Sequence, residues 1–174
     1  MLELGAHPCL YTLLASKRVG SGGKVYAFEP SPRDRRALRI HLIINLCRNV
    51  VLEGLALGEK DAESNLYVVE EWAAGCNDWL AKRKFARVDF VVDVEGAELG
   101  TLRGAAWLLE RRPQPIILAE VQDVRTLPSG YAAKQIIVYL INKVKHCLAC
   151  RKTAQGQAAE TALVPAGAAL ASRL

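Results

Sequence analysis

Short apolar runs alternate with longer helical stretches along most of the chain, and this alternation limits the fold more than any other feature. Runs rich in β-branched residues predict strands at residues 2–4, 24–28, 50–53, 88–92 and 116–120. Helical spacing of apolar residues, or residues typical of helix ends, predicts helices at residues 11–18, 32–46, 97–110 and 131–145. Parallel strands need a crossover that is usually a helix. The sequence therefore predicts an α/β fold with a doubly wound, mostly parallel sheet.

We expect this sheet to be irregular at both ends of the chain. The chain begins inside the first expected strand, which predicts a sheet truncated at the N-terminus. Residues 65–69 are expected to form a short extra strand. Residues 153–174 contain eight alanines and little apolar periodicity. We therefore expect an α/β domain at residues 1–150 and an Ala-rich tail at residues 151–174, either poorly ordered or forming an edge strand at residues 161–164.

The net charge of +5 does not by itself indicate a nucleic-acid partner. The basic residues form three separate groups, at residues 33–39, 82–87 and 143–152. A nucleic-acid surface would need these groups on one face with aromatic residues among them, and aromatics make up only 6% of the chain. We interpret the groups as solvated surface and expect no nucleic-acid partner, although an acidic substrate stays open.

The five cysteines predict a reducing compartment, because no secretory signal or membrane-spanning segment is evident. We therefore expect a cytoplasmic protein without a membrane contact. Cys147 and Cys150 form one C-x-x-C pair, which supplies two of the four ligands of a structural zinc site. No second pair completes the set, so no metal is expected.

Three features follow three of the core strands, at the strand ends where open α/β sheets bind ligands. Gly5 ends the first strand, and Glu29 ends the second, 24 residues later. Asp93, Glu95 and Glu98 follow the strand at residues 88–92. A glycine permits a tight turn, and a strand-end carboxylate can accept both hydroxyls of a ribose. Together they predict a site for a nucleoside-type cofactor. The alternatives are a turn glycine, a helix cap and carboxylates that favour a helix N-terminus.

In combination, these motifs resemble a known family. The segments that carry the resemblance are Leu2-Glu3-Leu4-Gly5-Ala6-His7, residues 11–15, Val25-Tyr26-Ala27-Phe28-Glu29-Pro30-Ser31-Pro32, residues 56–58, Asp89-Phe90-Val91-Val92-Asp93-Val94-Glu95-Gly96-Ala97-Glu98, residues 102–105 and residues 115–121. They look like the FkbM-type methyltransferases over roughly residues 2–121. The pairing of F-E-P with D-V-E-G-A-E is the specific part of this match.

The resemblance implies a class I (Rossmann-like) fold that uses S-adenosylmethionine, usually to methylate a hydroxyl of a small-molecule or sugar-like acceptor. It implies catalytic or acceptor-facing roles for Asp93 and Glu95. The residues that it assigns to the cofactor are Glu3, Gly5, Ala6 and His7 at the methionine end, Glu29, Pro30 and Ser31 at the ribose, and Ala56 and Leu57 at the adenine. Whether Asp93 or Glu95 is a general base or only orients the acceptor stays open.

The chain also departs from the family pattern. The first loop has Pro8-Cys9 where the family has a glycine, and the strand at residues 89–93 is one residue shorter and lacks a lysine. The segment between residues 69 and 89 is compressed, although Asn77-Asp78-Trp79-Leu80 keeps part of its motif. An inactive homologue or a nucleoside-binding module is therefore the alternative function. An incomplete sheet edge also favours a homodimer.

Overall fold

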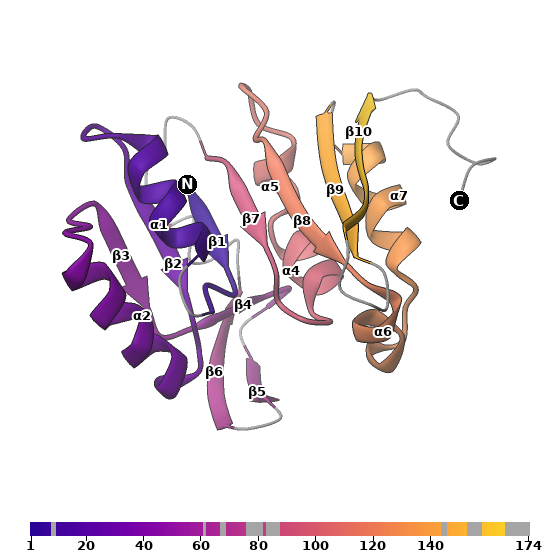
Figure 1. Cartoon of the computed structure of the whole chain (residues 1–174). Helices are drawn as coiled ribbons and strands as arrows, with labels where there is room; N and C mark the ends of the chain where they lie inside the picture. The colour runs from indigo at the N-terminus through magenta and orange to yellow at the C-terminus, as the bar shows by residue number, and fades with distance from the viewer. Residues whose placement is uncertain are drawn as a thin grey trace.

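The computed structural model describes residues 1–7, 10–60, 62–66, 69–75, 82, 88–143, 146–152 and 158–165. Within this part of the chain, one large sheet carries helices on both of its faces, and a small second sheet lies at one edge (Figure 1).

The large sheet has seven strands in the order β10-β9-β8-β7-β1-β2-β3. These strands are β1 Leu2–Leu4, β2 Val25–Phe28, β3 Val50–Glu53, β7 Phe90–Val92, β8 Ile117–Val121, β9 His146–Lys152 and β10 Ala158–Pro165. All neighbours pair in parallel except β9 and β10, which pair antiparallel. The predicted doubly wound, mostly parallel α/β sheet is therefore confirmed.

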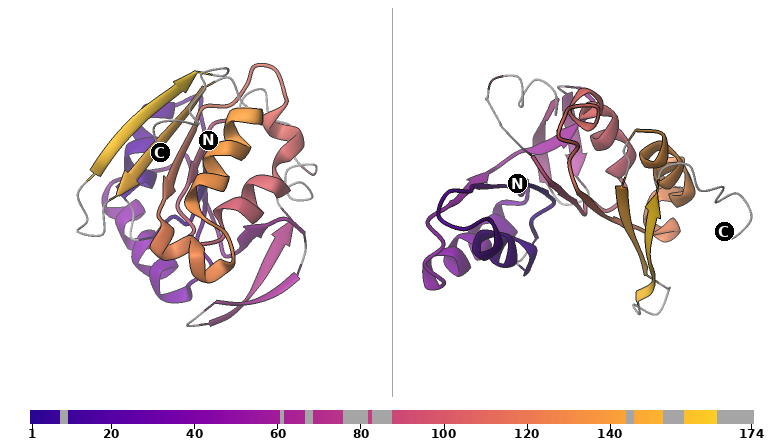
Figure 2. Two further views of the ribbon diagram at one scale, coloured as in Figure 1. Left: turned by 90° about the vertical axis from the view of Figure 1, so that its right-hand side faces the viewer. Right: turned by 90° about the horizontal axis from the view of Figure 1, so that it is seen from above.

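Helices cover the two faces of the sheet in the order that right-handed crossovers require. The helices α1 Leu10–Val19 and α2 Pro32–Ile44 lie on one face, and α4 Glu98–Gly104, α5 Ala106–Leu109 and α7 Ala133–Lys143 lie on the other (Figures 1 and 2). A short helix, α6 Asp123–Thr126, and a 3₁₀ turn at Leu127–Ser129 follow β8. No helix among these elements is long and apolar enough to cross a membrane.

Two apolar clusters correspond to the two covered faces. The larger cluster joins side chains of β1, β7 and β8 to those of α4, α5 and α7, and it includes Leu4, Val92 and Leu102. The smaller cluster, Ala6, Ala27, Leu38 and Leu42, lies between the sheet and α2. The start of α2 is well defined, because the Ser31 side chain accepts a hydrogen bond from the Asp34 N–H and Pro32 occupies the first turn.

The segment after β3 forms a separate small sheet, with the strand order β4-β6-β5. Its strands are β4 Ala56–Gly58, β5 Ala62–Leu66 and β6 Val69–Gly75. Figure 1 shows this sheet below the carboxyl ends of the central strands. The single strand expected at residues 65–69 is wrong, because these residues divide between β5 and β6, and residues 67–68 lie outside the described part. Short polar strands of this kind have little apolar alternation to reveal them.

The helix expected at residues 97–110 is interrupted, since α4 ends at Gly104 and α5 begins at Ala106. At this point α4 lies against the backbone of the small sheet. The Thr101 hydroxyl donates to the Leu57 carbonyl at 2.7 Å, and a Cβ on Gly104 would lie 2.1 Å from the Gly58 carbonyl oxygen. The interruption therefore reflects a close helix–strand contact that the local sequence does not reveal.

The C-terminal part differs in detail from the expectation. The strand β9, which the sequence did not predict, crosses residue 150, and β10 is longer than the expected strand at residues 161–164. The register of β9 and β10 shifts between Ala158 and Glu160. The division of the chain at residue 150 stays a prediction, and residues 166–174 lie outside the described part.

Two glycines of α4 make a matched pair for testing the contact with the small sheet. Gly104→Ala should lower the free energy of unfolding by about 1–3 kcal/mol, because the new methyl group must displace the Gly58–Glu59 backbone. Gly100→Ala, where a Cβ meets nothing within 4 Å, should instead raise it by about 0.5–1 kcal/mol. Urea unfolding of the two variants measures both values, and equal effects would contradict the contact.

Candidate cofactor site

The expected strand-end residues surround one cleft at the point where the sheet reverses its winding. From β1 the chain proceeds outward to β2 and β3, and it then returns to the other side of β1 as β7. Ligands of open α/β sheets bind at such a switch point, beyond the carboxyl ends of the strands. The cleft has a volume of ≈ 410 Å³, and the described residues that line it are Leu4, Gly5, His7, Phe28, Glu29, Pro30, Ser31, Arg33, Asp34, Leu55, Ala56, Leu57, Asp93, Val94, Glu95 and Ala97.

The chain just after β7 leaves no room for a side chain at Gly5. Its φ is +79°, a conformation that side chains disfavour, and a Cβ there would lie 1.9 Å from the Asp93 carbonyl oxygen. The N–H groups of Gly5 and Ala6 both donate to the Phe28 carbonyl, at 3.1 and 2.9 Å. The glycine therefore joins the ends of β1, β2 and β7. The sequence indicated a tight turn at Gly5, but it did not show that the close approach is to Asp93.

Glu29 connects the first two loops of the cleft. It is 6% exposed, and its two carboxylate oxygens accept hydrogen bonds from the backbone N–H groups of His7 and Ser31, each at 2.9 Å. Burial raises the pKa of this carboxyl, and the two N–H donors oppose the rise. Each oxygen retains a lone pair beyond these bonds. Glu29 can therefore orient the loops and still accept hydroxyl groups of a ligand.

Glu3 lies inside the sheet, without a cation at its register positions. It is 1% exposed, and its partners in register are Ala27 on β2 and Val91 on β7. Its Oε2 has no hydrogen-bond partner among the described residues. Burial raises the pKa of the Glu3 carboxyl to about 7; Thr12 opposes the rise, and the charges of Asp93 and Glu29 add to it. Val91 belongs to the strand that lacks the family's lysine, so the neighbour of Glu3 on β7 is apolar.

Asp93 and Glu95 lie between the cleft and a second, much smaller cavity. This cavity measures ≈ 20 Å³, and its other lining residues are Glu98, Glu120, Gln122 and Arg125. Glu95 has a φ of +47°, which is strained for a side chain of this size, and its carboxylate lies 3.4 Å from the Arg125 guanidinium. The two carboxylates therefore line the cleft on one side and, on the other, a space that holds about one water molecule.

The structure separates the remaining expected residues into two groups. His7, Pro30, Ser31, Ala56 and Leu57 line the cleft with Gly5 and Glu29, whereas Ala6 is buried in the cluster beneath α2, and Glu3 lies behind the cleft wall. The loop at Pro8-Cys9 and the motif at residues 77–80 lie outside the described part of the chain.

Several residues of the site were not predicted from the sequence. Arg33, Asp34 and Leu55 line the cleft. The Arg35 guanidinium donates to the carbonyl groups of Glu29 and Pro30, at 3.0 and 2.9 Å, and thereby holds the turn after β2. The arginine-rich start of α2 directly after Glu29-Pro30 was the available signal, but it is equally typical of a solvated helix.

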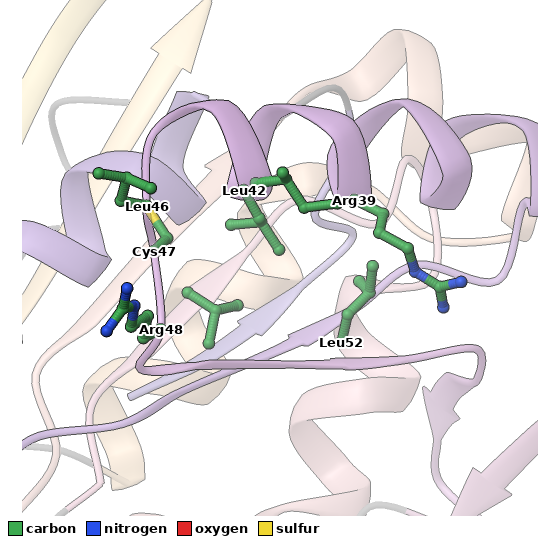
Figure 3. Close-up of a pocket in the computed structure, with 8 residues that line it drawn as sticks. Arg39, Leu42, Leu46, Cys47, Arg48 and Leu52 are labelled. Carbon is green, nitrogen blue, oxygen red and sulfur yellow. The ribbon is translucent and has the colours of Figure 1, made fainter.

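A larger cavity of ≈ 470 Å³ lies away from the strand ends, between α2 and the edge strand β3 (Figure 3). Its floor is apolar, formed by Leu42, Leu46 and Leu52, and Arg39 and Arg48 lie at its ends. In the described residues it contains no carboxylate, and the site predicted from the sequence is not part of it. We therefore treat it as a surface groove rather than the reactive site.

The fold and the cleft define a class of protein, the open α/β proteins that have a candidate ligand site beyond the carboxyl ends of their parallel strands. Residues 76–148 match the family model described as "Methyltransferase FkbM domain". The resemblance to FkbM-type methyltransferases inferred from the sequence is therefore confirmed.

A solved structure supports the same conclusion for the fold. The structure of methyltransferase FkbM from Methylobacillus flagellatus KT is similar to 87% of this chain, with a TM-score of 0.62 and 17% sequence identity. The chain spans 39% of the length of that protein. No match is found among curated protein sequences.

The buried Glu3 carboxyl predicts a pH-dependent stability. Because its folded-state pKa of about 7 lies above the ordinary glutamate value of 4.5, its contribution to stability is fully present below about pH 4.5 and is lost as the pH rises through 7. The free energy of unfolding of the wild type should fall relative to Glu3→Gln by about 3 kcal/mol between about pH 4 and pH 8.

Urea unfolding across this range measures the difference between the two proteins. Glu59→Gln, a change of the same kind at an exposed position, should follow the wild type at every pH. A constant difference between wild type and Glu3→Gln would contradict the raised pKa of Glu3.

Proposed function

We propose that this domain transfers a methyl group from S-adenosylmethionine to a hydroxyl of a small-molecule or sugar-like acceptor. One observation carries the proposal: Gly5, Glu29 and the Asp93–Glu95 turn, which follow three different strands, line the same cleft at the switch point of the sheet. The family match at residues 76–148 supports the methyltransferase assignment.

The residues of the cleft fit the chemistry of this cofactor. The buried Glu29 carboxylate retains acceptor capacity for the two ribose hydroxyls. Apolar side chains of Leu55, Ala56 and Leu57 offer a surface for the adenine. The carboxylates of Glu29, Asp93 and Glu95 make the cleft acidic, which favours a ligand with a positive sulfonium and ammonium group. Gly5, His7 and the Asp93 turn would then hold the methionine end.

S-adenosylmethionine supplies an electrophilic methyl group on its sulfonium sulfur. The protein contributes mainly by positioning, because an in-line displacement needs the acceptor oxygen aligned with that carbon. The acceptor hydroxyl must also lose its proton. Asp93 or Glu95 either accepts this proton as a general base or only orients the hydroxyl through hydrogen bonds.

A second candidate function is nucleoside binding without turnover. Glu29 fits this function as well, because a carboxylate that accepts ribose hydroxyls can do so without any methyl transfer following. The departure at Pro8-Cys9 also supports it, since this loop follows Gly5 directly.

The remaining parts of the proposal concern the partner and the compartment. β3 is the last strand of the sheet in the described region, and beside it five large apolar side chains are 36–75% exposed: Ile40, Ile43, Ile44, Leu46 and Val51. This supports a homodimer through the β3 edge, and a monomer mass in sedimentation velocity would contradict it. The free thiol of Cys47 is consistent with a reducing cytoplasm.

Cofactor binding is tested with S-adenosylhomocysteine, the demethylated product, as the probe. At 100 times its dissociation constant, it should raise the free energy of unfolding by about 2.7 kcal/mol. Glu29→Gln should weaken binding at least about tenfold, because a charge-assisted hydrogen bond contributes more than about 1.4 kcal/mol. Glu53→Gln, at the corresponding end of β3, should bind like the wild type. Absence of wild-type binding in calorimetry would refute the proposal.

The roles of Asp93 and Glu95 are separated by measuring binding and turnover together. Asp93→Asn and Glu95→Gln should keep the affinity for S-adenosylhomocysteine within a few-fold, since both changes preserve shape and this probe lacks the positive sulfonium group. The variant that removes a general base should lower turnover about 10²–10⁴-fold on an acceptor found by screening hydroxyl-bearing compounds. If both variants turn over normally, the carboxylates do not act as the base.

A further inference from the structure

We propose that Tyr131 and Glu98, which do not line the cofactor cleft, position the turn that carries Asp93 and Glu95. The inference rests on the proposed function for its catalytic consequence, while the structural arrangement is independent of it. We call the hydrogen bonds of Tyr131 and Glu98 to this turn the Tyr131–Glu98 clamp.

Glu98 anchors the turn from the side of α4. It is 3% exposed, and both of its carboxylate oxygens lie 3.0 Å from the Gly96 N–H, which donates to them. The residue before α4 is Ala97, which has no side-chain oxygen to cap the helix. Glu98 instead turns back toward Gly96 and accepts from its N–H, so the carboxylate fixes the turn that precedes α4.

Tyr131 anchors the same turn from a segment more than thirty residues away. Its hydroxyl oxygen lies 2.8 Å from the Gly96 carbonyl oxygen and 3.1 Å from Glu98 Oε2, and it accepts from the Leu99 N–H at 3.4 Å. A hydroxyl has one proton, so the Gly96 carbonyl and the carboxylate share a single donor. Burial raises the pKa of Tyr131 to about 12, so this donor keeps its proton at neutral pH.

The turn needs such an anchor because its backbone is strained at Glu95. Glu95 has a φ of +47°, which a side chain of this size disfavours, whereas the φ of +108° at Gly96 is one that glycine accommodates. Gly96 is also closely packed on its other side, where a Cβ would lie 2.7 Å from the Arg125 carbonyl oxygen and 2.9 Å from Ser129 Oγ. Strained backbone of this kind persists only where its surroundings hold it. The clamp on one side and the α6 region on the other provide that constraint.

The consequence for the cleft follows from which residues the turn contributes. Asp93, Val94, Glu95 and Ala97 line the cleft, and Gly96 lies between them. Displacement of Gly96 therefore moves the groups proposed to face the methyl donor and the acceptor. Tyr131 itself is not among the described residues of the cleft, so its effect on binding must pass through the turn.

The test compares two tyrosines whose hydroxyl groups both contact the α4 region. Tyr131→Phe removes the clamp donor and keeps the ring. Tyr139→Phe removes a hydroxyl that donates to the Leu102 carbonyl at 3.3 Å, at the other end of α4.

Amide hydrogen exchange of Gly96 and Leu99 reports on the turn without any ligand. Calorimetry with S-adenosylhomocysteine reports on the cleft, at a temperature where all variants are folded.

Tyr131→Phe should increase exchange at Gly96 and Leu99 and weaken S-adenosylhomocysteine binding, each by about tenfold. Tyr139→Phe should leave both within about twofold of the wild type. Glu98→Gln keeps one acceptor oxygen, so its effects on Gly96 exchange and on affinity should be smaller than those of Tyr131→Phe. This variant tests the clamp if Tyr131→Phe does not fold. Unchanged Gly96 exchange in both clamp variants, or equal loss of affinity in Tyr139→Phe, would overturn the inference.

The exchange measurement separates this inference from the proposed function. If the wild type does not bind S-adenosylhomocysteine, the proposed function fails. Faster exchange at Gly96 in Tyr131→Phe would then still support the clamp. If the wild type binds and the clamp variants match it in exchange and affinity, the clamp fails while the proposed function stands.

Discussion

The approach of Gly5 to the Asp93 carbonyl is the contact on which the site depends. It brings the end of β1 against the end of β7, the two strands between which the direction of winding reverses. The Asp93 N–H also donates to the Leu4 carbonyl, at 2.9 Å, which continues the ladder by one residue beyond β7. A side chain at Gly5 would separate these strand ends. The turns after β1, β2 and β7 would then no longer face a common cleft.

Much of the fold could be predicted because its signals are local. The runs at residues 2–4, 24–28 and 50–53 correspond closely to β1, β2 and β3, since each is a short, mostly apolar run that ends in a turn or loop signal. The break at Gly104 and the strands β4 and β9 could not be predicted in this way. They depend on contacts with distant segments, such as the Gly58 backbone for Gly104 and β8 for β9. Propensity over a few residues contains no information about such contacts.

The site shows the same division between local and distant signals. Gly5, Glu29 and Asp93 could be found from their places after strands, because the geometry of a parallel sheet brings such places together. Tyr131 could not be found, because nothing near it in the sequence indicates that its hydroxyl reaches Gly96. Ala6 shows what a motif alone does not reveal. It stands beside Gly5 and His7 in the sequence, whereas its side chain is buried in the cluster that contains Leu38.

The buried carboxylates of the site differ in the hydrogen bonds that compensate for their loss of hydration. Glu29 and Glu98 are buried and accept hydrogen bonds from backbone N–H groups. These bonds offset part of the desolvation cost of the two carboxylates, and each carboxylate fixes a loop. Glu3 receives less compensation between Ala27 and Val91, which explains why its pKa rises to about 7. A positively charged ligand in the adjacent cleft would favour the ionised form of Glu3. Binding of the proposed cofactor would therefore be coupled to the protonation of Glu3, although Glu3 is not among the described residues that line the cleft.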